Sequence, residues 1–311
     1  MKAAEDYKRI LVTGACGYIG SALTRQLTKE FPNAHIVLLD KRFVPNSLDR
    51  LPPHRFSFVK GDIMDKELVN KVCTDVDLIF HLAAEIGAED SMANAERVWE
   101  TNYNGTLNVI KAASKKAKFV FPSTANVFGR DNRPDRSEDD IPYPVFPYAN
   151  SKRAIESYLQ ENEARLPEFV ICRIATNYGW SEGIRNNLVV NKFAEMIASG
   201  ADKLTIYGTG ETWRPFVHVE DVARALCFVA LRPELVGGIV HLGGENHTIK
   251  DLAALAAKSA PRKVKLANLE HMESVFSYHL SFNKLKRLGF KCKWNVKTGF
   301  EDMLNHYGGL L

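Results

Sequence analysis

The chain has 311 residues, of which 45% are hydrophobic and 25% are charged. This length allows roughly two domains with a proper core, and the composition is ordinary for a globular protein. The formal net charge of +4 comes without the clustered basic residues typical of a nucleic-acid site. No apolar run approaches the roughly 20 residues that span a bilayer, so we expect neither a nucleic-acid nor a membrane partner.

The cysteines are scattered along the chain, without the spacing of a metal site. They are Cys16, Cys73, Cys172, Cys227 and Cys292. Dispersed cysteines in odd number fit reduced thiols, so the sequence predicts a cytoplasmic protein without a bound metal.

The predicted elements of the first half alternate between strands and helices. Strands are expected at 9–13, 35–40, 55–60, 76–82, 118–122 and 168–174, and helices at 20–29, 65–74, 93–115 and 148–163. Strands separated by helices favour an α/β fold with a doubly wound parallel sheet of the Rossmann type. A ligand of such a sheet lies beyond the carboxyl ends of its strands.

The second half is less regular. Helices are expected at 188–199 and 219–231 and a strand at 239–242, followed by mixed helices and loops. We expect a smaller mixed C-terminal lobe that closes over the substrate. Residues 130–147 carry four prolines and many charges, which predicts a surface loop leading into Tyr148.

A glycine-rich turn follows the first predicted strand. Residues 13–20 read TGACGYIG, and we call this segment the glycine turn. Gly14 permits the tight turn, Gly17 lets the backbone approach a pyrophosphate, and Gly20 lets the helix pack on the strand. The helix N-terminus that follows offers unpaired N–H groups to phosphate. The turn predicts a dinucleotide site, although three glycines in a turn also have a purely structural interpretation.

Asp40 ends the second predicted strand, twenty positions after Gly20. A carboxylate there accepts both ribose hydroxyls of NAD and repels the 2′-phosphate of NADP. Lys41 and Arg42 follow, and an adjacent cation can hold that phosphate, so NADP stays an alternative. Asp62 follows the third strand, where it can accept the adenine amino group or close a simple turn.

Tyr148 begins the segment YANSK, which has the spacing YxxxK. Residues four apart share a helix face, so the Lys152 ammonium is expected near the Tyr148 hydroxyl. That cation and a positive nicotinamide ring favour the phenolate, which makes Tyr148 a general base for a sugar hydroxyl. Thr124 follows the fifth strand and can hydrogen-bond the reacting oxygen. The alternative is a packed tyrosine, a solvated lysine and a threonine in an ordinary turn.

Six segments together resemble the extended short-chain dehydrogenase/reductases, and more narrowly the nucleotide-sugar epimerase/dehydratase family, which includes the UDP-glucose 4-epimerases. They are TGACGYIG, HLAA at 81–84, TNYNGT at 101–106, PSTANVFG at 122–129, PYANSK at 147–152 and RPFVHVEDVA at 214–223. The resemblance implies NAD as cofactor, a nucleoside-diphosphate sugar as substrate, and Thr124, Tyr148 and Lys152 as catalytic residues. It also implies a homodimer formed by the helices that start at Ala93 and Tyr148.

The resemblance divides the chain between the two ligands. Residues 1–175 and about 214–245 form the expected NAD-binding domain, and about 176–213 and 246–311 the substrate lobe. The implied cofactor residues are Gly14, Gly17, Tyr18, Ile19, Gly20, Asp40, Lys41, Asp62, Ile63, Leu82, Ala83, Ala84, Asn102, Tyr148 and Lys152. The implied substrate residues are Glu85, Ser91, Ser123, Thr124, Asn177, Asn187, Leu188 and Arg214. Arg214 would bind the diphosphate, and its plainer alternative is a surface salt bridge.

Departures from the family pattern narrow the predicted chemistry. The dehydratases carry Asp-Glu after the catalytic threonine, and the 3,5-epimerising branch carries cysteine where Asn126 stands. Ala125 and Asn126 therefore argue against both reactions. Thr176 replaces an asparagine of the pattern, which leaves the role of Asn177 open. The favoured function is 4-epimerisation through a 4-keto intermediate, with a 4-dehydrogenase, a 4-ketoreductase and a non-catalytic NAD-binding regulator as alternatives.

Overall fold

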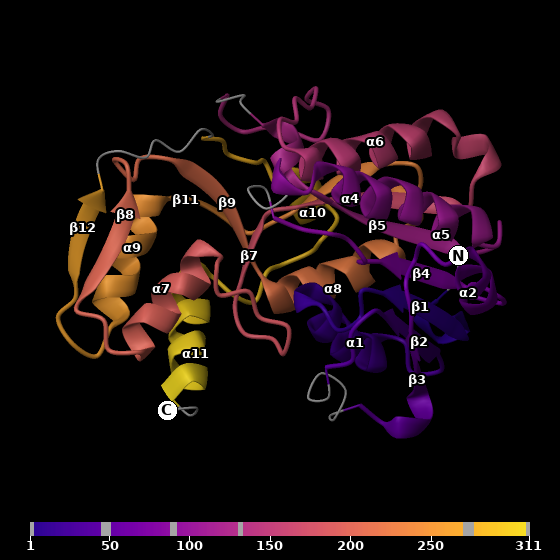
Figure 1. Cartoon of the computed structure of the whole chain (residues 1–311), viewed down its shortest axis with the longest axis horizontal. Helices are drawn as coiled ribbons and strands as arrows, with labels where there is room; N and C mark the ends of the chain where they lie inside the picture. Colours follow the sequence, from indigo (N-terminus) through magenta and orange to yellow (C-terminus); the bar gives the residue numbers. More distant parts are fainter. Residues whose placement is uncertain (1–2, 45–50, 88–91, 130–132, 270–276, 309–311) are drawn as a thin grey trace.

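A seven-stranded parallel sheet organises the larger part of the molecule (Figure 1). The structure is a computed structural model that describes residues 3–44, 51–87, 92–129, 133–269 and 277–308. The strand order is β10-β6-β5-β4-β1-β2-β3. The strands are β1 Arg9–Thr13, β2 His35–Asp40, β3 Phe56–Lys60, β4 Leu78–His81, β5 Lys118–Thr124, β6 Glu168–Ile174 and β10 Ile239–Leu242. This order confirms the predicted doubly wound α/β fold.

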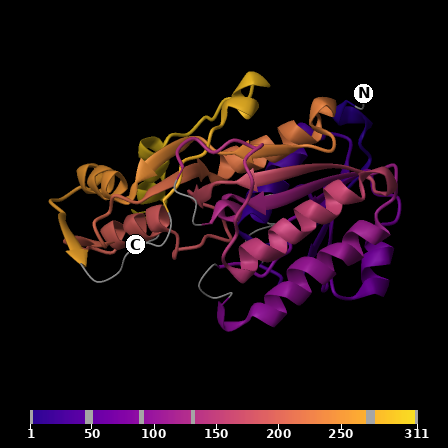
Figure 2. The same cartoon turned by 90° about the horizontal axis from the view of Figure 1, so that it is seen from above.

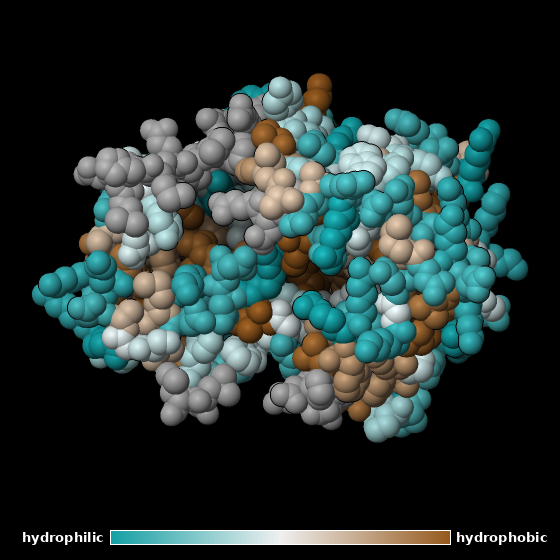
Figure 3. All heavy atoms as spheres, viewed as in Figure 1, coloured by the Kyte–Doolittle hydropathy of each residue, from teal (hydrophilic) through white to brown (hydrophobic). Residues whose placement is uncertain are grey.

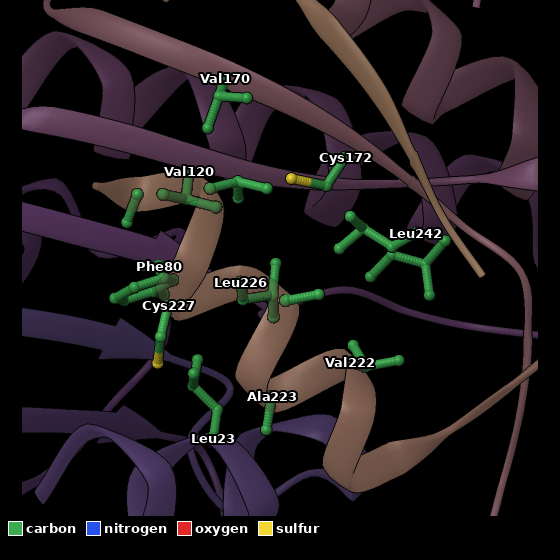
Figure 4. Packing of buried hydrophobic residues seen from close by; sticks show 14 of the residues in the cluster. Leu23, Phe80, Val120, Val170, Cys172, Val222, Ala223, Leu226, Cys227 and Leu242 are labelled. Carbon is green, nitrogen blue, oxygen red and sulfur yellow. The ribbon is translucent and has the colours of Figure 1, made fainter. Parts of the chain in front are cut away.

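Helices cover both faces of this sheet (Figure 2). One face packs against α1 Tyr18–Glu30 and α8 Val219–Ala230, as Figure 4 shows for Phe80 and Val120 around Leu226. The other face packs against α2 Lys66–Val72, α5 Thr106–Ala112 and α6 Pro147–Glu161. Apolar residues on both sides of the strands explain the near-continuous apolar runs in the sequence.

The predicted helix over 93–115 is wrong as a single helix. It divides into α4 Ala95–Trp99, a π-helical turn Glu100–Gly105 and α5. At the turn the Thr106 hydroxyl donates to the Asn102 carbonyl at 2.6 Å, and the Asn102 side chain reaches the backbone of Glu85. A π-helical turn often marks a functional position, and here it aims Asn102 at the segment that follows β4.

Short strands, none of them predicted from the sequence, build the smaller lobe. β11 Glu245–Thr248, β9 Trp213–His218 and β7 Thr176–Tyr178 form one sheet, and β12 Lys265–Leu269 pairs with β8 Lys203–Tyr207. Helices α7 Val189–Ala198, α9 Ile249–Ser259 and α11 Val296–Gly308 surround a separate apolar core, and α10 is Asn283–Arg287. The lobe is small and mixed, as predicted.

The domain boundaries stay a prediction. β9 belongs to the small sheet, whereas α8 and β10 return the chain to the large one. Across the described parts of the chain, no helix combines the length and apolarity that a membrane span needs.

Candidate active site

Two adjoining cavities open at the carboxyl edge of the large sheet. β1 and β4 pair with Thr13 opposite His81, so the glycine turn and residues 82–87 leave the sheet side by side. The glycine-turn cavity measures about 570 Å³, and the Thr124 cavity, above residues 122–126, about 430 Å³. Both sizes suit small organic ligands. Figure 3 shows a hollow with a hydrophobic floor between the two lobes.

Most of the residues predicted at the cofactor line the glycine-turn cavity. They are Gly14, Gly17, Tyr18, Ile19, Gly20, Asp40, Lys41, Ile63, Leu82, Ala83, Ala84 and Tyr148. Gly14 has φ +69°, and a Cβ there would lie 2.7 Å from the Ala83 nitrogen. Only glycine lets the turn pass this close to the next strand end.

The charges beside Asp40 suit an unphosphorylated ribose. The Asp40 carboxylate accepts the Cys16 and Arg42 N–H groups at 2.9 and 3.0 Å. Lys41 lies 3.1 Å from the Asp62 carboxylate and 3.8 Å from that of Glu85. Lys41, one of the two cations that left NADP open, is therefore already engaged by two carboxylates, whereas Arg42 lines the cavity and Asp62 does not.

Tyr148 and Thr124 meet where the cavities join. Pro147 opens α6, so Tyr148 lies in its first turn, and Thr124 ends β5. Both side chains line the Thr124 cavity, and the Thr124 hydroxyl accepts the Asn126 N–H at 3.2 Å. Burial raises the pKa of Tyr148, while the charge of Arg185 and the nearby Thr124 hydroxyl oppose the rise. The structure thus brings both side chains to one cavity, and their joint action on a reacting oxygen stays a prediction.

The Lys152 ammonium is buried below them. Its Nζ atom donates to the Pro122 carbonyl at 2.9 Å and lies 4.8 Å from the centre of the Phe121 ring. Among the described residues it makes no hydrogen bond to Tyr148, although both side chains line the Thr124 cavity. Burial lowers the pKa of Lys152 to about 8, and Glu156 opposes this effect.

Sequence reasoning missed the ionic network beneath this site. Glu156 is fully buried and accepts hydrogen bonds from Arg173 at 2.9 and 3.2 Å. It also accepts a hydrogen bond from the Ser123 hydroxyl at 2.5 Å. Ser123 lines the Thr124 cavity, so the network reaches the wall of that cavity. The sequence did offer a signal for this network: Glu156 stands four residues after Lys152, and that spacing places the two side chains on the same helix face.

The other predicted substrate residues divide between the cavities and the rest of the molecule. Asn177, Asn187 and Leu188 line the Thr124 cavity, and Glu85 lines the glycine-turn cavity. The Oδ1 atom of Asn177 is buried and has no hydrogen-bond partner among the described residues. A buried acceptor of this kind is costly unless a ligand satisfies it.

Arg214 does not lie with the predicted substrate residues that line the two cavities. Its guanidinium donates to the Trp213 carbonyl at 2.9 Å and lies 5.5 Å from the centre of the Tyr278 ring, and it lines neither cavity. Its predicted contact with a diphosphate stays a prediction. Asn102 instead supports the backbone beside the site. Its side-chain oxygen accepts the Glu85 N–H at 2.8 Å, and its side-chain nitrogen donates to the Glu85 carbonyl at 2.9 Å. Ser91 lies outside the described residues.

Arg185 lines both cavities and was not singled out from the sequence. It lies in an irregular segment between β7 and α7, where periodicity carries no signal. The described residues hold no cluster of side chains suited to a metal ion.

Comparison with known proteins agrees with this geometry. Residues 10–243 match the model of the NAD dependent epimerase/dehydratase family. The low-salt glycan biosynthesis protein Agl12 of Haloferax volcanii is 30% identical, covering 96% of this chain and 98% of that protein. The crystal structure of UDP-glucuronic acid 4-epimerase from Bacillus cereus, in complex with UDP-glucuronic acid and NAD, is 26% identical with TM-score 0.85, covering 97% and 100% of the chains.

The crystal structure of DesIV, a dTDP-glucose 4,6-dehydratase from Streptomyces venezuelae with NAD bound, is 28% identical with TM-score 0.82 and covers 96% of both chains. The resemblance noted in the sequence is therefore confirmed at the level of the family. NAD is the cofactor of this group, and the glycine-turn cavity fits it. The chain belongs to the NAD-dependent epimerase/dehydratase family and is an enzyme of that type.

Proposed function

We propose that the protein is a nucleotide-sugar 4-epimerase that works through a 4-keto intermediate. The observation that carries the proposal is that Thr124, Tyr148 and Lys152 line one cavity, and that Tyr148 also lines the adjoining glycine-turn cavity. When bound, NAD supplies the hydride acceptor and donor beside the sugar. One cavity would then hold the dinucleotide and the other the sugar nucleotide, with the reacting carbon at their junction.

The protein's own residues would move the proton. The Tyr148 phenolate takes the proton of the C4 hydroxyl as that carbon is oxidised, and Thr124 hydrogen-bonds the same oxygen. Lys152 keeps a positive charge close to this site, which favours the phenolate. After the 4-keto sugar turns over, Tyr148 would return the proton to the oxygen, with the hydride supplied to the other face of the carbon by bound cofactor.

The chemistry of the cavity wall argues against dehydration. The described lining of the Thr124 cavity contains no aspartate, glutamate, histidine or cysteine. Losing water from the sugar, or inverting its C3 or C5, requires a further acid or base beyond Tyr148. Ala125 is buried, and the Asn126 side chain accepts the Tyr278 hydroxyl at 2.9 Å. The wall supports a reaction confined to one hydroxyl-bearing carbon.

The test is Tyr148→Phe, with Tyr143→Phe at an exposed position of the loop that precedes α6 as the control. A panel of uridine, thymidine, guanosine and cytidine diphosphate sugars is followed by NMR at C4. We expect turnover to fall by about a thousandfold in Tyr148→Phe, in line with removal of a general base, with NAD retained. Near-full turnover by this variant would contradict the assignment.

A net 4-dehydrogenase or 4-ketoreductase would use the same residues. The absorbance of NADH separates them: an epimerase converts sugar without net reduction of added NAD, whereas an oxidoreductase consumes it in proportion to product. A stoichiometric consumption of cofactor would replace our proposal with this alternative.

We also propose that the enzyme is a homodimer paired through α4 and α6. Trp99 on α4 is 42% exposed and its ring stacks on that of Tyr103 with the centroids 4.9 Å apart, which leaves an exposed aromatic side chain on this side. Such side chains are enriched at interfaces. Sedimentation at micromolar concentration is expected to give a dimer for the wild type and a monomer for Trp99→Glu, with Tyr207→Glu in the other lobe as the control. A monomeric wild type would refute the proposal.

A further inference from the structure

The segment 179–188, which we call the strap, is tied to the first turn of α1. The Tyr18 hydroxyl donates to the Gly179 carbonyl at 2.6 Å, and the Ser181 hydroxyl donates to the Tyr18 carbonyl at 2.8 Å. The Asn191 amide donates to both the Tyr18 hydroxyl and the Arg185 carbonyl at 3.0 Å. These bonds fix the strap across the glycine turn and fix the backbone that carries Arg185.

The strap also touches the glycine turn directly. A Cβ at Gly183 would lie 2.6 Å from the Gly17 carbonyl carbon and 2.7 Å from the Tyr18 nitrogen, both backbone atoms. On its other side, the Asn186 side chain accepts the Tyr307 hydroxyl of α11 at 2.8 Å. The strap is therefore held between the two lobes, and its side chains have a defined position relative to both cavities.

Arg185 projects from the strap to the junction of the cavities. It is half-buried and lines both of them. Within the described parts of the chain, its guanidinium makes no hydrogen bond and no ion pair. The other cation of the Thr124 cavity, Lys152, is already bonded to a carbonyl. A half-buried guanidinium without a counter-ion is costly, and a ligand anion removes that cost.

We propose that Arg185 is a diphosphate-binding residue at the junction of the two ligand sites. Both ligands carry a diphosphate, that of NAD and, resting on the proposed function, that of the sugar nucleotide. A guanidinium presents paired donors that match phosphate oxygens, and those oxygens would complete its hydrogen bonds. Arg185 also opposes the rise in the pKa of Tyr148, which agrees with its place beside the proposed base.

The experiment compares Arg185→Gln and Arg185→Lys with Arg165→Gln, an exposed arginine that lines neither cavity. For each purified full-length protein, calorimetry measures the binding of UDP, dTDP, GDP and CDP. Chromatography measures the NAD retained per chain, and urea unfolding checks that the variants fold. No readout depends on turnover, so an inactive enzyme does not obscure the result.

We expect binding of the preferred nucleoside diphosphate to weaken by about 10- to 100-fold in Arg185→Gln, the loss typical of a charge-assisted hydrogen bond. Arg185→Lys should recover part of it, and Arg165→Gln should match the wild type. Weaker binding of the nucleoside diphosphate with a normal NAD content assigns Arg185 to the diphosphate of the substrate. Normal binding of the nucleoside diphosphate with a reduced NAD content assigns it to the diphosphate of NAD. Binding and NAD content both within twofold of the wild type would overturn the inference, even if the Tyr148→Phe test upholds the proposed function.

Discussion

Glu156→Gln tests how the buried network supports both the fold and Lys152. Glu156 and Arg173 are 0% and 1% exposed and share two hydrogen bonds. The substitution keeps the shape of the side chain but removes its charge, which leaves the Arg173 guanidinium buried without a counter-ion. Removing one partner of a buried pair costs about 3–5 kcal/mol, a large share of the about 5–15 kcal/mol that stabilises a typical protein.

The double variant Glu156→Leu with Arg173→Met separates stability from electrostatics. Replacing both members of a buried pair by apolar side chains is often neutral or stabilising. The Ser123 hydroxyl loses its acceptor in this variant, which costs about 1 kcal/mol, and the part-exposed Arg153 loses its 3.3 Å contact with Glu156, which costs at most about 1 kcal/mol more. We therefore expect the double variant to lose no more than about 2 kcal/mol, less than the single variant.

Lys152 should respond to both variants in the same way. Burial has already lowered its pKa to about 8, and Glu156 opposes that shift. Without the Glu156 charge the pKa falls further, so less of the ammonium keeps its proton near neutral pH. The activity lost above neutral pH should therefore begin at a lower pH in both variants.

Urea unfolding followed by circular dichroism gives the free energy of unfolding, and kcat/KM between pH 6 and 9 gives the titration. The reasoning is refuted if Glu156→Gln costs less than about 1 kcal/mol, or if the double variant is as unstable as the single one, because a buried unpaired charge would then not be the cause.

Three further predictions use other parts of the structure. Gly183→Ala forces the strap away from the glycine turn, so NAD retained after purification should fall several-fold, while Gly308→Ala, whose added carbon meets nothing within 4 Å, should retain it. Asp40→Ser removes the charge that repels a 2′-phosphate, so the ratio of activities with added NADP and NAD should rise by about tenfold; an unchanged ratio would argue against a ribose contact. Burial lowers the pKa of three histidine rings from 6.5 to about 3. Between pH 7 and pH 5 these rings therefore bind a proton in the unfolded chain but not in the folded protein. Each should lower the free energy of unfolding by about 2 kcal/mol over this range as the pH falls. The three residues are His81, His218 and His241. Replacing one by glutamine should lessen the loss measured by urea unfolding at the two pH values, and an unchanged pH dependence would contradict the burial argument.

Local patterns in the sequence predicted much of the fold and part of the site. Alternating apolar strands and amphipathic helices led to the doubly wound sheet, because each element buries its own apolar face. The glycine turn and the YxxxK spacing could also be identified from the sequence, because the geometry of each depends on residues only a few positions apart. The short strands of the smaller lobe were missed because three to six residues carry too little periodicity.

Tertiary structure alone decided which charged side chains line the two cavities. The motif predicted Arg214 as a diphosphate ligand, and that stays a prediction, because the guanidinium lies by the Tyr278 ring and lines neither cavity. Arg185, from a segment without periodicity, lines both cavities. Lys152 shares a helix face with Tyr148 as predicted, yet its ammonium bonds to the Pro122 carbonyl of a neighbouring strand. The physical reason is that spacing fixes the direction of a side chain on its own element, whereas its partner comes from another part of the chain that only the folded protein brings near.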